Sequence, residues 1–251
     1  MRRYAVYPSL EDRTVFITGG ASGIGAAMVE AFAGQGSRVG FVDIDTEAGE
    51  ALAGRLGGSV AFVPCDLRDI GQLRDSFGAL KARLGPAAVL VNNAARDDRH
   101  DWREVTPEYW DERMATNLRH FFFAIQTVAP DMIGMGGGSI INYGSISWMQ
   151  REGGMPAYTT AKSAVQGLTR TMARDLGVHR IRVNTLVAGW VMTERQKALW
   201  ATPEALEKHR ERQCLKDFVQ PEHMARAALW LASDDSVMCT AQDFMVEAGV
   251  I

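Results

Sequence analysis

Short apolar runs alternate with longer amphipathic stretches along almost the whole chain. The runs are rich in Val, Ile and Phe, and they lie at 14–18, 37–43, 59–64, 88–94, 138–145, 181–187 and 243–249. Several are apolar at consecutive positions, which is typical of strands buried on both faces of a parallel sheet. The pattern therefore predicts a strand at each run.

Amphipathic stretches fill the intervals and predict helices. They begin near Gly25 and after residue 43, extend to Leu84, and continue at 109–129, around the sequence "AYTTAKSAV" (157–165) and at 222–233. This alternation predicts an α/β fold with a doubly wound parallel sheet, Rossmann-like, in three αβα layers. No internal repeat or low-complexity linker interrupts it, so one domain accounts for 1–251.

The segment from Trp190 to Lys216 breaks the alternation. It is helix-like, polar and aromatic, and it stands between the run at 181–187 and the helix at 222–233. We interpret 190–216 as an insertion that covers an active site, because such segments often do so.

Composition and charge narrow the classes of protein. The chain has 251 residues, 47% of them hydrophobic, which is enough for one substantial core. The formal net charge of -3 comes from 27 basic and 30 acidic residues. Because a nucleic-acid partner favours a basic excess, we predict no such partner.

The cysteines and the N-terminal residues bear on the compartment. Cys65, Cys214 and Cys239 form no C-x-x-C pair, which predicts no metal site, and their odd number indicates a reducing compartment. Two arginines near the start, Arg2 and Arg3, have no apolar stretch behind them, and the apolar run at 121–125 is too short to span a bilayer. The sequence predicts a cytoplasmic protein without a membrane partner.

A glycine-rich turn, "TGGASGIG" at 18–25, follows the first run and opens the first helix. Glycines at this spacing permit a tight turn and close approach of the backbone to a pyrophosphate at a helix N-terminus. Asp43 ends the second run, about 20 residues further on, where an acid can bind the adenosine ribose and repel a 2′-phosphate. We predict NAD as the cofactor; the alternative is that Asp43 caps a turn and that Arg38 or another base admits NADP.

Two later strand ends fit the same nucleotide. Asp66 and Leu67 follow the third run, where a carboxylate and a backbone amide can hold an adenine edge. Asn93 lies in "NNAA" (92–95), after the fourth run. Either could be ordinary turn chemistry, because Asn and Asp are common turn residues.

Tyr158 and Lys162 are four positions apart in a predicted helix, so their side chains share one face. Taken alone, an exposed pair of this kind is common and has little effect. Its meaning depends on the other motifs.

Taken in order, the glycine turn, "NNAA", Asn117, Ser145, Tyr158-x-x-x-Lys162 and "AGWVMT" resemble the short-chain dehydrogenase/reductase family, from about residue 10 to the C-terminus. The resemblance implies a single NAD-binding catalytic domain with a seven-stranded parallel sheet, assembled as a homotetramer. The cofactor-binding residues it implies are Gly19, Ser22, Gly23, Ile24, Gly25, Asp43, Asp66, Leu67, Asn93, Tyr158, Lys162, Val191 and Thr193.

The resemblance also implies the catalytic roles. Tyr158 is the acid/base, Lys162 its electrostatic partner, Ser145 the donor to the substrate oxygen, and Asn117 a water-holding relay. Otherwise Ser145 is a buried hydroxyl and Asn117 a helix N-cap. The chain departs from the family pattern at Ala95, Ala188 and Gly144, which affects the shape of the nicotinamide loop rather than the reacting groups.

Stretches such as "NAARDDRH", "INYGSISW" and "RQCLK" further resemble the sugar 1-dehydrogenase branch, which includes bacterial D-xylose, L-arabinose and L-fucose dehydrogenases. This implies oxidation of a cyclic aldose at C1 to a lactone. Ser147, Gln150 and Trp190 are the expected sugar contacts, because an indole face suits sugar C–H groups and polar groups fix hydroxyls. The alternatives are a polyol, ketoacyl or hydroxysteroid oxidoreductase, and a non-catalytic NAD sensor or scaffold.

The chemistry requires a phenol that loses its proton. A free tyrosine has a pKa of about 10 and is a poor base at neutral pH. The ammonium of Lys162 and a positive nicotinamide ring both favour the phenolate, so we predict a lowered pKa for Tyr158. Tyr158 then takes the proton of the anomeric hydroxyl while a hydride leaves C1.

Overall fold

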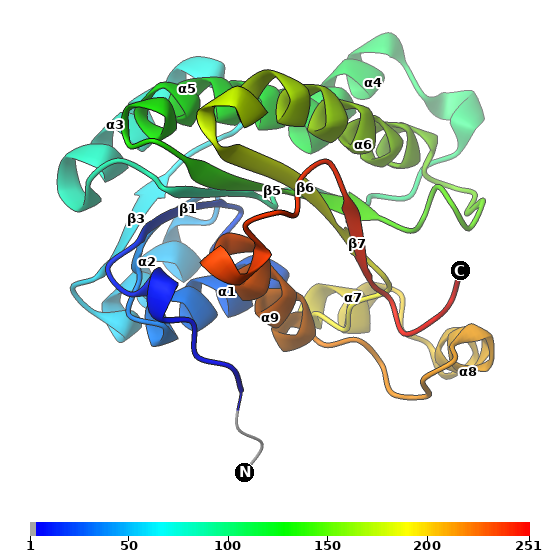
Figure 1. The fold of residues 1–251 in the computed structure, drawn as a ribbon. Coiled ribbons are helices and arrows are strands. Elements are labelled where there is room, and N and C mark those ends of the chain that lie inside the picture. Colours follow the sequence, from blue (N-terminus) through cyan, green and yellow to red (C-terminus); the bar gives the residue numbers. More distant parts are fainter. Residues whose placement is uncertain (1–3) are drawn as a thin grey trace.

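Seven parallel strands form the centre of the structure, a computed structural model that describes residues 4–251 (Figure 1). Arg2 and Arg3, considered above with the N-terminal residues, lie outside the described residues. The strand order is β3-β2-β1-β4-β5-β6-β7, which confirms the predicted sheet. The strands are β1 (Thr14–Thr18), β2 (Arg38–Asp43), β3 (Val60–Pro64), β4 (Val89–Asn92), β5 (Gly138–Ser145), β6 (Ile181–Ala188) and β7 (Asp243–Val246).

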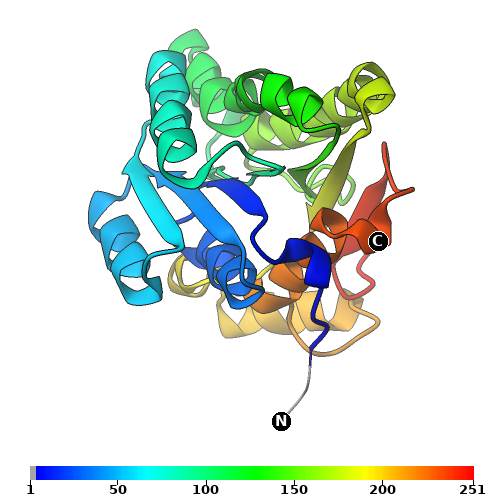
Figure 2. The same cartoon turned by 60° about the vertical axis from the view of Figure 1, so that its left-hand side comes forward.

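Helices cover both faces of the sheet, as Figures 1 and 2 show. On one face lie α1 (Gly23–Gly34), α2 (Thr46–Leu56) and α9 (Pro221–Ala232); on the other lie α3 (Ile70–Leu84), α4 (Pro107–Met114), α5 (His120–Gly134) and α6 (Pro156–Leu176). Each layer packs on the sheet through its own apolar cluster.

The buried pattern explains why these residues form strands. All five residues of β1 are buried, and so are seven of the eight in β5. On α6, Ala157, Ala161 and Val165 are buried at four-residue spacing, so one face of the helix lies on the sheet.

One predicted helix is divided in the structure. The stretch at 109–129 forms α4, a π-helical segment (Ala115–Arg119) and α5. A π turn inserts a single residue into a helix, a local change that hydrophobic periodicity counted over a whole helix does not reveal. The last strand is also shorter than predicted, because β7 ends at Val246.

From β1 the sheet continues in one direction to β2 and β3 and in the other to β4, so the strand order reverses between β1 and β4. In open α/β sheets, ligands bind at such a point, outside the carboxyl ends of the strands. The segment at 190–216 supplies α7 (Glu194–Leu199) and α8 (Pro203–Arg212), which lie beside β7 and α9 in Figure 1. Across residues 4–251, no helix is long and apolar enough to cross a membrane.

Candidate active site

A cleft of about 1150 Å³ opens at the carboxyl ends of the strands, and residues of α7 and α8 form part of its wall. With one exception, Asn117, every residue that the sequence nominated for the site lines this cleft. These lining residues are Gly19, Ser22, Gly23, Ile24, Gly25, Asp43, Asp66, Leu67, Asn93, Ser145, Ser147, Gln150, Tyr158, Lys162, Trp190, Val191 and Thr193.

The glycine turn is shaped as a phosphate cradle. Gly19 has φ +68°, and a Cβ on Gly25 would lie 1.8 Å from the carbonyl oxygen of Gly19, so no side chain fits there. Ser22 is the N-cap of α1 but makes no side-chain capping bond, and the first turn holds no acidic residue. The amides at this helix N-terminus are therefore suited to an anion such as a pyrophosphate.

Asp43 ties the glycine turn to β2. Its Oδ2 accepts from the amide of Ala21 at 2.9 Å and its Oδ1 from the amide of Asp45 at 3.1 Å. Each oxygen keeps capacity for another donor, and the side chain is partly exposed in the cleft. Arg38 stands at the opposite end of β2 and donates to the carbonyl of Asp12 at 3.0 Å, so it is not the base beside Asp43.

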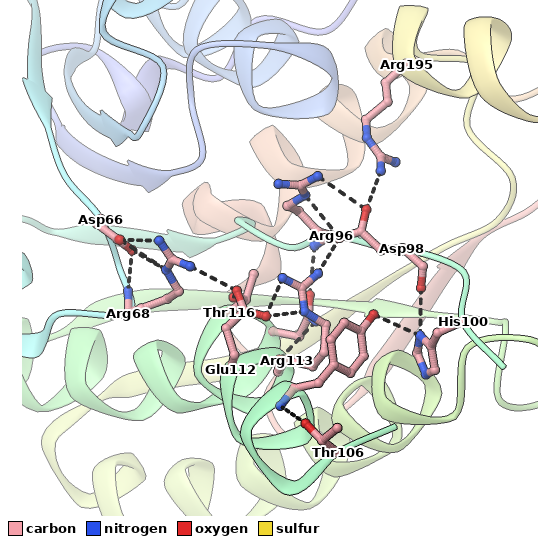
Figure 3. A network of polar contacts seen from close by, with 12 residues as sticks. Asp66, Arg68, Arg96, Asp98, His100, Thr106, Glu112, Arg113, Thr116 and Arg195 are labelled. Atoms are coloured by element: carbon pink, nitrogen blue, oxygen red, sulfur yellow. Dashed lines mark hydrogen bonds and ion pairs between the residues drawn. The ribbon is translucent and has the colours of Figure 1, made fainter. Parts of the chain in front are cut away.

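Asp66 is already engaged by a cation. Its carboxylate accepts from the guanidinium of Arg68 at 2.6 Å, and Arg68 also contacts Glu112 at 3.0 Å (Figure 3). The hydrogen bond from Arg68 lowers the pKa of Asp66. An adenine at this position would therefore have to share the carboxylate with Arg68.

Asn93 and Thr193 brace the glycine turn instead of standing free. The Nδ2 of Asn93 donates to the carbonyls of Thr18 at 3.0 Å and Gly19 at 2.9 Å. Thr193 caps α7 by accepting from the amide of Gln196 at 3.2 Å, and a Cβ on Gly23 would approach its methyl group to 3.2 Å. The start of α7 thus packs against the cradle.

Ser145, Tyr158 and Lys162 come together at the end of β5 and the first two turns of α6. The Oγ of Ser145 donates to the Oγ of Ser147 at 3.0 Å and accepts from its amide at 3.2 Å. Lys162, 2% exposed, donates to the carbonyl of Tyr143 at 2.8 Å, and its Nζ lies 5.8 Å from the centre of the Tyr158 ring. The nitrogen therefore lies close to the Tyr158 ring.

The protein groups alone do not lower the pKa of Tyr158; the predicted lowering includes the positive nicotinamide ring and stays a prediction. Burial and then Asp97 raise the pKa of Tyr158, while the Ser145 hydroxyl, Arg99 and Arg195 lower it; together they bring it to about 12. Burial lowers the pKa of Lys162 to about 7. The surrounding protein atoms desolvate both groups, and desolvation disfavours whichever form is charged.

Asn117 lies in the π-helical segment and is fully buried behind the cleft. Its Oδ1 accepts from the amide of Arg96 at 2.8 Å, and its Nδ2 donates to the carbonyl of Arg113 at 3.0 Å. The N-cap alternative is wrong, because the residue sits inside a continuous helical stretch. Its role as a water-holding relay stays a prediction.

The outer part of the cleft contains polar atoms that lack partners. Trp190 donates from Nε1 to the Oε1 of Gln196 at 2.9 Å, and its ring meets the His209 ring edge-on at 5.1 Å. Gln150 Nε2, Trp200 Nε1 and His209 Nε2 are buried and find no hydrogen-bond partner within the part of the chain that the structure describes. Since buried polar groups are usually paired, a polar ligand could satisfy them.

Sequence reasoning missed Trp200 and His209 in the cleft wall, and also Asp97 and Arg195, which pair there at 2.5 Å. Asp97 lies within the stretch "NAARDDRH", but nothing local assigns it a partner, and only the fold brings the loop after β4 to the segment at 190–216. Within residues 4–251, no group of three or more His, Cys, Asp and Glu side chains could hold a metal ion.

Comparison with known proteins places this geometry in a family. The sequence model described as enoyl-(acyl carrier protein) reductase matches residues 19–251. "Probable galactose dehydrogenase GalD" of Rhizobium meliloti is 48% identical over 97% of each chain, and "D-xylose 1-dehydrogenase" of Caulobacter vibrioides is 46% identical over 98% of each.

A solved structure gives the same result. A blue fluorescent protein from a metagenomic library, in complex with NADPH, superposes with a TM-score of 0.89 at 30% identity, covering 96% of this chain and 99% of the other. These findings confirm the resemblance seen in the motifs, including its likeness to sugar dehydrogenases. The chain belongs to the short-chain dehydrogenase/reductase family, whose members use NAD(P).

Proposed function

We propose that this oxidoreductase transfers a hydride from C1 of a cyclic aldose to NAD and forms the lactone. The observation that carries the proposal is a single cleft lined both by Ser145 and Tyr158 and by Gln150, Trp200 and His209, side chains that each keep a polar atom without a hydrogen-bond partner in the described residues. Two relatives at 46% and 48% identity are named for the sugars D-xylose and galactose, which supports an aldose substrate.

The outer cleft suits a polyhydroxylated ring better than an apolar substrate. Trp190 and Trp200 offer apolar faces for sugar C–H groups, and the unpartnered polar atoms can bond to hydroxyls. An apolar substrate would leave those atoms buried without partners, which costs about 1–3 kcal/mol for each. This favours a sugar over a hydroxysteroid.

The nicotinamide, when bound, supplies the acceptor for the hydride that leaves C1. Tyr158 takes the proton of the anomeric hydroxyl, and Ser145 donates to the same oxygen as it gains carbonyl character. Ser147 supports this step because its amide keeps the Oγ of Ser145 in place at 3.2 Å while the Ser145 proton turns toward the substrate.

In its protonated form, Lys162 holds positive charge close to the Tyr158 ring, and it is anchored by the carbonyl of Tyr143. Because burial, together with the charges nearby, brings the pKa of Tyr158 to about 12, the phenolate needs additional positive charge from outside the chain. A positively charged nicotinamide beside the phenol would provide it. We therefore infer that Tyr158 becomes an effective base only in the complex with oxidised cofactor.

We infer NAD rather than NADP from Asp43. Its carboxylate stands at the end of β2 and lines the cleft, where it can accept from ribose hydroxyls and would repel a 2′-phosphate. The glycine cradle, Asn93, Val191 and Thr193 would enclose the remaining parts of the dinucleotide, and Asp66 and Leu67 its adenine end.

We also propose that 1–251 works as one catalytic domain, with the segment at 190–216 covering the sugar. The family resemblance supports a cytoplasmic homotetramer. Light scattering of the purified protein would give the mass of the assembly, and a monomer would contradict this part of the proposal.

A substrate panel tests the activity. Formation of reduced cofactor would be followed by absorbance with D-xylose, galactose, L-arabinose, L-fucose, the corresponding polyols and apolar alcohols, each with NAD and with NADP. We expect turnover with aldoses and NAD, and a lactone that hydroxylamine traps. Turnover with polyols or apolar alcohols alone would favour another oxidoreductase, and a silent panel with intact NAD binding would favour the sensor.

Tyr158→Phe tests the mechanism. We expect turnover to fall by at least about 100-fold while NAD still binds. Tyr109→Phe is the matched control, since the Tyr109 hydroxyl contacts the His100 ring at 3.1 Å and does not line the cleft. Near-normal turnover in Tyr158→Phe would overturn the assignment.

A further inference from the structure

The short helix α7 lies over the cleft without an apolar anchor. None of its six residues is buried, although Glu194, Arg195 and Gln196 line the cleft. A helix this short is not stable by itself, so contacts outside the helix must fix its position.

Polar contacts to the loop after β4 supply that anchor. The guanidinium of Arg195 contacts Asp97 Oδ1 at 2.5 Å and Asp98 Oδ1 at 2.8 Å. The neighbouring Gln196 donates from Nε2 to Asp97 Oδ2 at 2.9 Å. Two adjacent residues of α7 therefore hydrogen-bond to two adjacent aspartates that lie about a hundred positions earlier in the chain.

The loop end of this contact is itself held firmly. Asp98 also contacts Arg113, whose side chain is 8% exposed, and Arg96 at 3.3 Å (Figure 3). The amide of Arg96 is bound by the buried Asn117. The aspartates thus form a fixed platform, and α7 is the element that could move.

Asp97 and Arg195 also lie in the electrostatic surroundings of Tyr158. The charged groups that face the phenol are Asp97 and Arg99 from the loop after β4, Arg195 from α7, and Lys162 close to the ring. Asp97 raises the pKa of Tyr158, whereas Arg195 and Arg99 lower it. Since Asp97 and Arg195 are in contact, their effects on the phenol oppose each other.

We propose that Arg195 and Asp97 form a latch that holds α7 over the bound substrate and neutralises the Asp97 carboxylate beside the reacting phenol. Both are positioning residues in this scheme, since they act through α7 and Tyr158. The inference rests on the proposed function for its substrate, but the latch itself can be measured without turnover.

Three variants and one control separate the two effects of the latch. The variants are Arg195→Gln, Asp97→Asn and the double variant. The control is Lys197→Gln, which removes a cation from the same helix, but one that pairs with Glu194 of α7 itself at 2.7 Å.

Amide hydrogen exchange measures the closure of α7 without substrate. We expect exchange in 190–200 to be roughly threefold or more faster in the three latch variants, and unchanged in Lys197→Gln. Unchanged exchange in Arg195→Gln would overturn the latch. Faster exchange in a protein that oxidises no aldose would leave the latch standing and refute only the proposed function.

A pH titration of tyrosinate absorbance in the complex with NAD measures the charge effect. Subtracting the titration of Tyr158→Phe leaves the signal of Tyr158 and gives its midpoint. Arg195→Gln leaves the Asp97 carboxylate without its cation, so the Tyr158 midpoint should rise by about half a pH unit or more. Asp97→Asn should lower the midpoint, and the double variant should lie between them. The KM for the aldose should rise roughly threefold to tenfold in all three variants. Midpoints that shift in the same direction in both single variants would overturn the charge effect.

Discussion

The ammonium of Lys162 donates to the main-chain carbonyl of Tyr143 at 2.8 Å, a contact that fixes a buried cation close to the ring of the proposed base. The side chain is only 2% exposed, and burial lowers its pKa to about 7 from an ordinary value of 10.5. The fold therefore keeps this amine at the expense of stability, as sites that perform chemistry often do.

Replacing the lysine should reveal this cost. Below about pH 7 the folded protein buries the charged ammonium of Lys162. Between about pH 7 and 10 Lys162 is protonated in the unfolded chain but not in the folded chain. The contribution of Lys162 to stability therefore rises with pH over this range. Lys162→Met removes this penalty. Near pH 6 we expect the variant's free energy of unfolding to exceed that of the native protein by roughly 1–3 kcal/mol, and near pH 10 we expect this difference to be smaller.

Urea unfolding across this pH range checks the prediction for Lys162. Lys197→Met is the control, because Lys197 is exposed on α7 and should show no such pH dependence. A stability gap for Lys162→Met that stays constant or widens toward pH 10 would contradict it.

The glycine cradle predicts a contrast within one helix. Gly25→Ala places a methyl group 1.8 Å from the carbonyl oxygen of Gly19, so the turn must open, and we expect the dissociation constant for NAD to rise by at least about tenfold. Gly34→Ala in the same helix meets no atom within 4 Å and should stabilise the fold by up to about 1 kcal/mol. Calorimetric titration and thermal unfolding check both variants; equal NAD affinity in the two would contradict the role of the cradle.

Cofactor choice should depend on the Asp43 carboxylate. Asp43→Asn removes the charge that repels a 2′-phosphate and weakens the bonds to ribose hydroxyls, so we expect the ratio of kcat/KM for NAD over NADP to fall by about tenfold or more. Glu47→Gln, which removes an exposed charge from the first turn of α2, should leave the ratio unchanged. Native Asp43 protein that prefers NADP would refute the inference directly.

The elements that could be predicted from sequence are those whose signals are local. Consecutive apolar residues predicted the buried strands. The glycine turn predicted the cradle, because Gly19 has a φ of +68°, a conformation that other residues rarely adopt. The order of motifs also located Ser145, Tyr158 and Lys162 in one cleft.

The parts that could not be predicted depend on contacts between distant residues. Asp66 lies at the strand end where we expect the adenine to bind. Whether Arg68 already occupies the Asp66 carboxylate depends on side-chain conformation. The effect of burial on the pKa of Tyr158 could not be predicted either, because it depends on how many atoms surround the ring, which spacing along a helix does not give. The pairing of Asp97 with Arg195 requires the complete fold.

Asn117 gives a test that separates positioning from stability. Asn117→Ala removes an acceptor for the amide of Arg96 and a donor to the carbonyl of Arg113, two main-chain contacts behind the cleft. The matched control is Asn184→Ala: Asn184 is equally buried and also makes two main-chain bonds, at 2.8 Å to Cys239 and 3.1 Å from Gln242, beside β7.

Both Asn variants should lose about 1–3 kcal/mol of unfolding free energy, since each removes two hydrogen bonds to the main chain. Only Asn117→Ala should lower kcat, by about tenfold or more, because the loop it holds carries Asp97 and leads into the cleft. NAD affinity should change little, as Asn117 does not line the cleft. Parallel losses of stability with equal kcat in the two variants would show that Asn117 serves the fold alone, and that the loop after β4 keeps its catalytic shape without it.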